Sequence, residues 1–122
     1  MWEVEFTDEF EEFWDLLNEN EQVDVAAVVN LLERFGNRLG YPHSSKINNA
    51  KTTHLRELRI QHAGDPYRVL YAFDPKRCAI LLIGGKKTGQ DRWYEKYIPI
   101  ADKLYAEHLI TLELEKEEIY NE

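Results

Sequence analysis

The stretch HLRELRIQHAGDPYRVLYAFD, residues 54–74, decides the fold. It contains two runs that alternate apolar and polar side chains, as half-buried β-strands do, and the connection between them ends in Gly64-Asp65-Pro66. We therefore expect strands over 55–60 and 67–73 that pair as an antiparallel hairpin. This register places the main apolar side chains of both strands on one face of the sheet: Leu58, Ile60, Tyr67, Val69, Tyr71 and Phe73.

The opposite face of the same hairpin carries two arginines. Arg59 and Arg68 are expected to lie directly across from each other, where like charges destabilise a sheet. A sequence that keeps both arginines indicates either an anionic partner or a local counter-ion, and Glu57 stands on the same face. Arginine side chains suit phosphate oxygens in particular, because the guanidinium group offers two parallel N–H donors.

A third strand over 78–83 is expected to run back along the second, because Asp74-Pro75 marks a turn between them. Pairing Phe73 with Cys78 puts Ile83 beside Arg68. Lys86 and Lys87 then emerge at the end of the sheet that carries the arginines. The sequence therefore predicts a basic cluster of Arg59, Arg68, Lys86 and Lys87.

The rest of the chain supplies one more strand and three helices. Residues 2–6 alternate as an edge strand would, and apolar residues at helical spacing predict helices within 8–17 and 25–35. Residues 37–54 read as a loop, and a last helix is expected around 93–105, kinked or starting near Pro99. We predict an α+β fold: a small curved antiparallel sheet, made of an N-terminal strand and a three-stranded meander, with a helix hairpin and a C-terminal helix on one face.

Charge is distributed unevenly along the chain. The formal net charge is −8, but residues 41–97 hold eleven Lys/Arg against five Asp/Glu, whereas residues 1–40 hold two against eleven. The basic segment is the one that carries the arginine hairpin, which suits an anionic partner. Alternatively, the segments neutralise one another in the fold. We expect a single domain over 1–109 and an acidic C-terminal tail over 110–122.

Nothing in the sequence indicates a membrane segment, a metal or a cofactor. No apolar run is long enough to span a bilayer, no signal peptide is recognisable, and Cys78 is the single cysteine, which suits a cytoplasmic protein. The four histidines show no metal-ligand spacing. The glycines of 84–89 resemble a P-loop, but the Lys-Ser/Thr pair is missing and no βαβ context exists.

Several motifs together resemble the RelE/ParE toxin superfamily, most closely its HigB-like, phage-derived branch. The resemblance covers about residues 1–109 and is carried by Pro42…Lys46-Ile47, LRELRI at 55–60, YRVLY at 67–71, LIGGKKTG at 82–89 and DRWYEKYIPIADKLYAEHL at 91–109. It implies the toxin of a type II toxin–antitoxin pair, whose partners are a cognate helix-turn-helix antitoxin, mRNA and the ribosome. Such toxins cleave mRNA within the ribosome without a metal ion: the ribose 2′-OH attacks the adjacent phosphate.

The resemblance also implies site residues. Arg59, Arg68 and Lys87 fall where the family carries catalytic cations, and Tyr94 and His54 are further catalytic candidates. Lys46, Lys86 and Arg92 are expected to bind RNA. Two other functions stay open: a ParE-like protein that poisons DNA gyrase by binding, and a regulator without catalysis that binds only its partner. The identity of a general base and the oligomeric state do not follow from the sequence.

Overall fold

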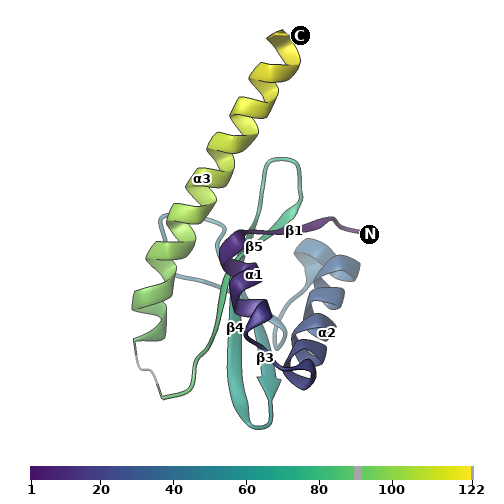
Figure 1. Cartoon of the computed structure of the whole chain (residues 1–122), viewed down its shortest axis with the longest axis vertical. Coiled ribbons are helices and arrows are strands. Elements are labelled where there is room, and N and C mark those ends of the chain that lie inside the picture. Colours follow the sequence, from purple (N-terminus) through teal and green to yellow (C-terminus); the bar gives the residue numbers. More distant parts are fainter. Residues whose placement is uncertain (90–91, 122) are drawn as a thin grey trace.

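The computed structural model describes residues 1–89 and 92–121, of which residues 120 and 121 are described by their backbone alone. A five-stranded sheet in the order β1-β5-β4-β3-β2 lies between two helical layers (Figure 1). In chain order the elements are β1 (Val4–Phe6), α1 (Asp8–Asp15), α2 (Glu19–Phe35), a 3-10 turn (Gly36–Arg38), β2 (Ser44–Lys46), β3 (Arg56–His62), β4 (Asp65–Phe73), β5 (Ala79–Lys86) and α3 (Trp93–Asn121).

The predicted meander of β3, β4 and β5 is confirmed, and Arg59 pairs with Arg68 as expected. The expected neighbour of Arg68 on the other side is wrong: Gly85 stands there, and Ile83 pairs with Leu70. The reason is a register shift between β4 and β5, since Phe73 pairs with Ala79 and β5 holds one extra residue next to Tyr71. A bulge of this kind cannot be recognised from the alternation of apolar and polar residues in the sequence.

The α+β fold class is confirmed, but the sheet is mixed and not purely antiparallel. β1 pairs in parallel with β5, from Val4 opposite Ala79 to Phe6 opposite Leu81. The segment 37–54, expected to be a loop, contains the three-residue strand β2, which pairs with β3. A strand of three residues is too short to show an alternating pattern.

The helix hairpin of α1 and α2 covers the apolar face of the meander, as predicted. Thr7 caps α1, and Asn18 forms a capping box with Glu21 at the start of α2. The buried core on this side contains helix and strand residues together: Phe10, Val25, Val28 and Leu32 with Leu58, Ile60, Val69 and Tyr71. Burial of each such side chain is worth about 1.5–3 kcal/mol, so packing holds the acidic hairpin in place.

The prediction that all helices share one face is wrong, because α3 packs on the other side of the sheet (Figure 1). Trp93, Ala101 and Leu104 of α3 lie in a second core cluster. The sheet contributes Leu70, Ile80 and Leu82 to it. A continuous apolar run such as 78–83 is typical of a strand that is buried on both faces.

α3 is one helix from Trp93 through Pro99 to Asn121, so the expected alternative of a start near Pro99 is wrong, and the helix continues into the acidic tail. Its last turns project beyond the sheet, and residues 111–119 are exposed except for half-buried Leu112 (Figure 1). Within the described part of the chain, no helix is both long and apolar enough to cross a membrane.

Candidate active site

A buried carboxylate, that of Glu57, lies at the centre of the site with 4% of the residue exposed. Ser45 donates from Oγ to Oε2 over 2.6 Å, and Arg59 donates from Nη1 to the same oxygen over 3.2 Å. The other oxygen, Oε1, accepts from the Tyr94 hydroxyl over 2.5 Å and lies 3.5 Å from Nε of Arg68. Side chains from β2, β3, β4 and α3 thus converge on one carboxylate, as the burial of a charge requires.

The two arginines differ in how they are held. Arg68 is 4% exposed, and its Nη1 donates to the Tyr67 carbonyl over 3.0 Å. Its buried Nε reaches Glu57 at ion-pair distance but has no hydrogen-bond partner among the described residues. The Arg59 side chain is 28% exposed and lies over the Tyr41 ring at 5.2 Å. Glu57 therefore serves as the local counter-ion, and guanidinium donors remain available for an anion.

Gly85 lets α3 pack closely on β5, which brings Tyr94 to this carboxylate. A Cβ atom at Gly85 would lie 3.0 Å from Nε1 of Trp93 and 3.4 Å from the Tyr97 ring. The glycine thus lets these rings pack directly on β5, where Trp93 is 1% exposed and stacks on Tyr97 at 4.4 Å. Tyr94 follows Trp93 on the first turn of α3, so this packing fixes its position.

Tyr94 keeps its proton at neutral pH. Burial is the largest cause that raises the pKa of this hydroxyl above its ordinary value, and the hydrogen bond to Glu57 raises it further. Arg68 opposes these effects without reversing them. The site therefore pairs a protonated hydroxyl with a carboxylate, which are a proton donor and a proton acceptor in contact.

One of the two predicted lysines joins the site. Lys87 Nζ lies 4.9 Å from the centre of the Tyr94 ring. Lys86 does not, because its Nζ pairs with Asp65 at 3.0 Å and lies over the Tyr67 ring on the other face. Successive residues of a strand point to opposite faces, which separates the two lysines. Of the four residues of the predicted basic cluster, the structure thus brings together Arg59, Arg68 and Lys87.

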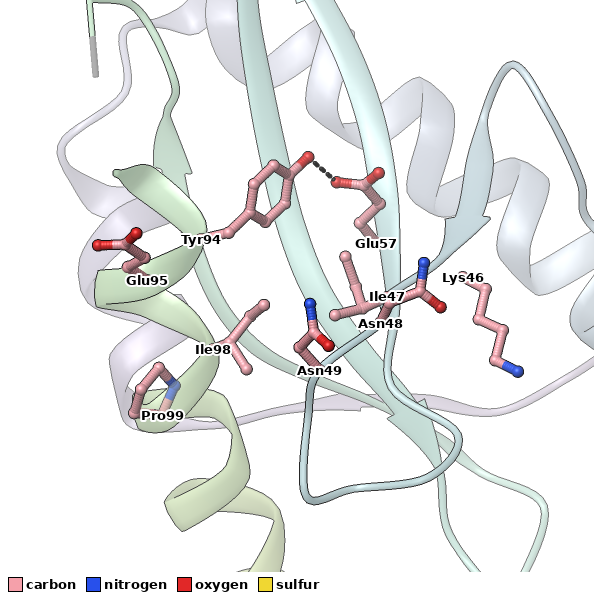
Figure 2. A pocket seen from close by; sticks show the side chains of 9 residues that line it. All are labelled: Lys46, Ile47, Asn48, Asn49, Glu57, Tyr94, Glu95, Ile98 and Pro99. Carbon is pink, nitrogen blue, oxygen red and sulfur yellow. Dashed lines mark hydrogen bonds between the residues drawn. The ribbon is translucent and has the colours of Figure 1, made fainter. Parts of the chain in front are cut away.

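A pocket of about 530 Å³ opens beside Glu57 and Tyr94 (Figure 2). The dashed line in Figure 2 marks their hydrogen bond, and Asn48 and Asn49 of the loop after β2 line the same pocket. The lining residues are Lys46, Ile47, Asn48, Asn49, Glu57, Tyr94, Glu95, Ile98 and Pro99. The pocket gives a ligand access to the proton donor and acceptor.

Three other predicted residues lie outside this contact network. Lys46 lines the pocket, but its ammonium group points away from Tyr94 (Figure 2). Arg92 is exposed and lies 3.9 Å from Glu95. His54 is exposed and lies before β3, and among the described residues it makes no hydrogen bond or ion pair with the carboxylate and does not line the pocket beside it. Its position suits binding better than catalysis.

Three contributors to the site do not follow from the sequence in these roles. Glu57 stands two residues before Arg59 and so on the same face, which predicts a counter-ion but no contact with Tyr94. Ser45 gives no signal, because β2 is too short to show the alternation of a strand. Tyr41 lies far from the arginines in sequence, and no pattern connects it with them.

A group of possible metal ligands lies elsewhere. Glu3, Glu5 and Cys78 have ligand atoms within 4.8 Å of one another, at the β1 edge of the sheet. Burial raises the pKa of the Cys78 thiol to about 11, and the carboxylates of Glu5, Asp74 and Glu3 add to the effect. This group has no part in the site around Glu57.

Comparison with known proteins shows which family this chain belongs to. Residues 12–106 match the model of the family described as "Phage derived protein Gp49-like (DUF891)". The chain is 44% identical over 94 residues to the "Putative toxin HigB3" of Mycobacterium tuberculosis, a match that covers 76% of this chain and 81% of the relative. It is 38% identical over 91 residues to the "Putative toxin HigB2" of the same organism, covering 73% of this chain and 45% of that longer relative.

The fold has a counterpart among solved structures. The crystal structure of the isolated E. coli RelE toxin superposes with a TM-score of 0.58, covering 82% of this chain and 99% of RelE at 13% sequence identity. At that identity the likeness concerns the fold alone. Together with the family match and the two relatives, it confirms that the chain belongs to the Gp49-like family of phage-derived proteins, in the HigB-like branch of the RelE superfamily.

Proposed function

We propose that this chain is the toxin of a type II toxin–antitoxin pair and that it inhibits translation by cutting mRNA on the ribosome. Family membership and two relatives named as toxins support the toxin role. The observation that carries the nuclease activity is the Glu57 carboxylate, which contacts the Tyr94 hydroxyl and lies within reach of both arginines. The partner that neutralises it would be a cognate antitoxin, and the place of action would be the cytoplasm.

The site contains each group that RNA transesterification requires. The Glu57 carboxylate accepts the proton of the ribose 2′-OH as its oxygen attacks the adjacent phosphorus. Arg59 and Arg68 stabilise the negative charge that develops on the phosphorane oxygens. The P–O5′ bond breaks, and the Tyr94 hydroxyl protonates the leaving oxygen. Glu57 then returns a proton to Tyr94 through their hydrogen bond, which restores the site and leaves a cyclic phosphate and a 5′-OH end.

Lys87 has a supporting role in this scheme. Its ammonium group lies over the Tyr94 ring, 4.9 Å from the ring centre. A positive charge there favours the phenolate that exists briefly after Tyr94 has given up its proton. None of these steps requires a metal ion.

Mapping RNA ends in cells that express the chain tests the proposal. Expression of the native protein should produce new mRNA ends with 5′-OH and cyclic phosphate groups within translated regions, and Tyr94→Phe should remove them. Tyr97→Phe is a matched control, because Tyr97 packs on Trp93 but lies outside the contacts of Glu57. Growth arrest with DNA breaks and unchanged mRNA ends would instead identify a gyrase poison and refute the nuclease.

A further inference from the structure

A second pocket, of about 780 Å³, continues from the first along α3. The two pockets share Asn49, Ile98 and Pro99, so they form one groove between α3 and the loop 47–54. The groove passes from Tyr94 to at least Lys103, nine residues along the helix. At 1.5 Å per residue this is roughly 14 Å, farther than one bound phosphate extends.

The far half of the groove is lined by two lysines, a histidine and apolar surface. Lys51 and His54 come from the loop, and Lys103 comes from α3 on the facing wall. The one carboxylate in this lining, that of Asp102, accepts hydrogen bonds from the backbone N–H groups of Lys51 and Thr52, both over 2.9 Å. Asp102 therefore fastens the loop to α3, and its charge is partly offset by these donors.

We propose that this groove holds single-stranded RNA next to the cleaved phosphate. The proposal rests on the proposed function and extends it from one phosphate to the flanking nucleotides. Lys51 and Lys103 would contact successive backbone phosphates from opposite walls, with His54 beside them. Ile98 and Pro99, at the junction of the two pockets, offer an apolar floor on which a base can pack.

Two observations favour RNA over a peptide as the occupant. The groove is continuous with the pocket that Glu57 and Tyr94 line, so a strand that is cut beside these two residues must leave the site along some surface. Cations stand on both of its walls, whereas the chain as a whole is acidic, with a net charge of −8. In the far half of the groove, Lys51 and Lys103 outnumber the single carboxylate, that of Asp102, and this small excess suits a polyanion there.

The test is length-dependent binding of 2′-fluoro RNA, which lacks the attacking hydroxyl and so is not cut. Fluorescence anisotropy would compare oligonucleotides of about three and about ten nucleotides at several salt concentrations. The longer RNA should bind the native protein at least about tenfold more tightly. In Lys51→Ala/Lys103→Ala this advantage should disappear, and the slope of log K against log salt should become shallower by about 1.4, that is 0.7 for each lost phosphate contact.

The control is Lys76→Ala/Lys116→Ala, which removes the same charge away from the groove and should keep both the length dependence and the salt slope. Three results would overturn the proposal: equal losses of RNA affinity in the two variants, an unchanged salt slope in Lys51→Ala/Lys103→Ala, or no length dependence in the native protein. If Lys51→Ala/Lys103→Ala binds RNA like the native protein but no longer binds a partner protein, the groove binds that protein and the RNA proposal is wrong. Because the test measures binding alone, failure of cleavage in cells would refute the nuclease and leave this result standing.

Discussion

The Tyr94 hydroxyl donates a 2.5 Å hydrogen bond to Oε1 of Glu57 and thereby joins the first turn of α3 to the middle of the sheet. The two residues are 37 positions apart in the chain, and this bond brings the two groups that would transfer protons into direct contact. The first test of the site should therefore break this bond without moving the helix.

Tyr94→Phe removes the hydroxyl and keeps the ring under Lys87. We expect RNA cleavage to fall by about a hundredfold or more, because general acid catalysis contributes at least that much. The free energy of unfolding should fall by only about 1 kcal/mol, the net value of one hydrogen bond. Single-turnover cleavage assays and urea unfolding measure the two effects. A cleavage rate within about threefold of the native rate would exclude Tyr94 as the acid.

Arg68→Ala should abolish toxicity while the domain remains folded. Each charge-assisted contact to phosphate is worth roughly 1.5–3 kcal/mol, so the loss corresponds to a ten- to hundredfold lower rate if the contact forms only in the transition state. Glu57 keeps Ser45, Arg59 and Tyr94 as partners, which limits the structural damage. Growth assays with circular dichroism measure both effects.

Arg68→Lys is the informative companion, since it retains the charge and loses the two-pronged donor geometry. We expect it to fold like the native protein and to remain largely inactive. A folded Arg68→Ala protein with full toxicity would remove this arginine from the site.

Gly85→Ala should disturb the site through packing. The added methyl group meets Trp93 Nε1 at 3.0 Å, so the first turn of α3 must shift, at a cost of about 1–3 kcal/mol. We expect changed tryptophan fluorescence and lower cleavage. Gly40→Ala is the control, because a Cβ there has no neighbour within 4 Å. Equal activity of the two variants would show that Tyr94 does not depend on this contact.

Tyr67 is expected to make the free energy of unfolding decrease at alkaline pH. Its hydroxyl donates to Glu21, and this bond, with burial as the second cause, raises the pKa of Tyr67 from 10.0 to about 12. The contribution to stability is complete below the unfolded pKa of 10.0 and is lost as the pH rises to about 12, because the unfolded chain releases the proton first. Urea unfolding across this range should show a smaller stability loss in Tyr67→Phe than in the native protein, and equal losses would contradict the assignment.

Deleting residues 111–122 should leave the melting temperature nearly unchanged, because the side chains of 111–119 are exposed except for half-buried Leu112. It should also strengthen binding to RNA or ribosomes at low salt, since the segment is acidic. Thermal melting and ribosome co-sedimentation test both effects. A stability loss of more than about 2 kcal/mol would make the tail part of the core, and unchanged binding would show that its charge does not oppose the site.

The arginine pair could be predicted because strand alternation and hairpin closure act over neighbouring residues. Arg59 opposite Arg68 follows from a period of two, and so does the apolar face beneath the helix hairpin. The neighbour of Arg68 could not be predicted, since the register shift beside Leu70 and Tyr71 cannot be recognised from the alternation of side chains. Glu57 was placed on the right face, but its contact with Tyr94 required knowing that α3 covers that face. The domain boundary at 109 stays a prediction.

The parallel pairing of β1 with β5 has a consequence for synthesis of the protein. Val4 lies beside Ala79, 75 residues later, so the first strand has no partner until most of the sheet has been translated. At 5–20 residues per second the N-terminal segment waits roughly 4–15 s for this contact. Distant pairings of this kind form late, because loop-closure entropy opposes them until the intervening chain is ordered. A nascent chain that stops before β5 therefore lacks both the strand that pairs with β1 and the helix that carries Tyr94, so the proposed site cannot form in an interrupted copy.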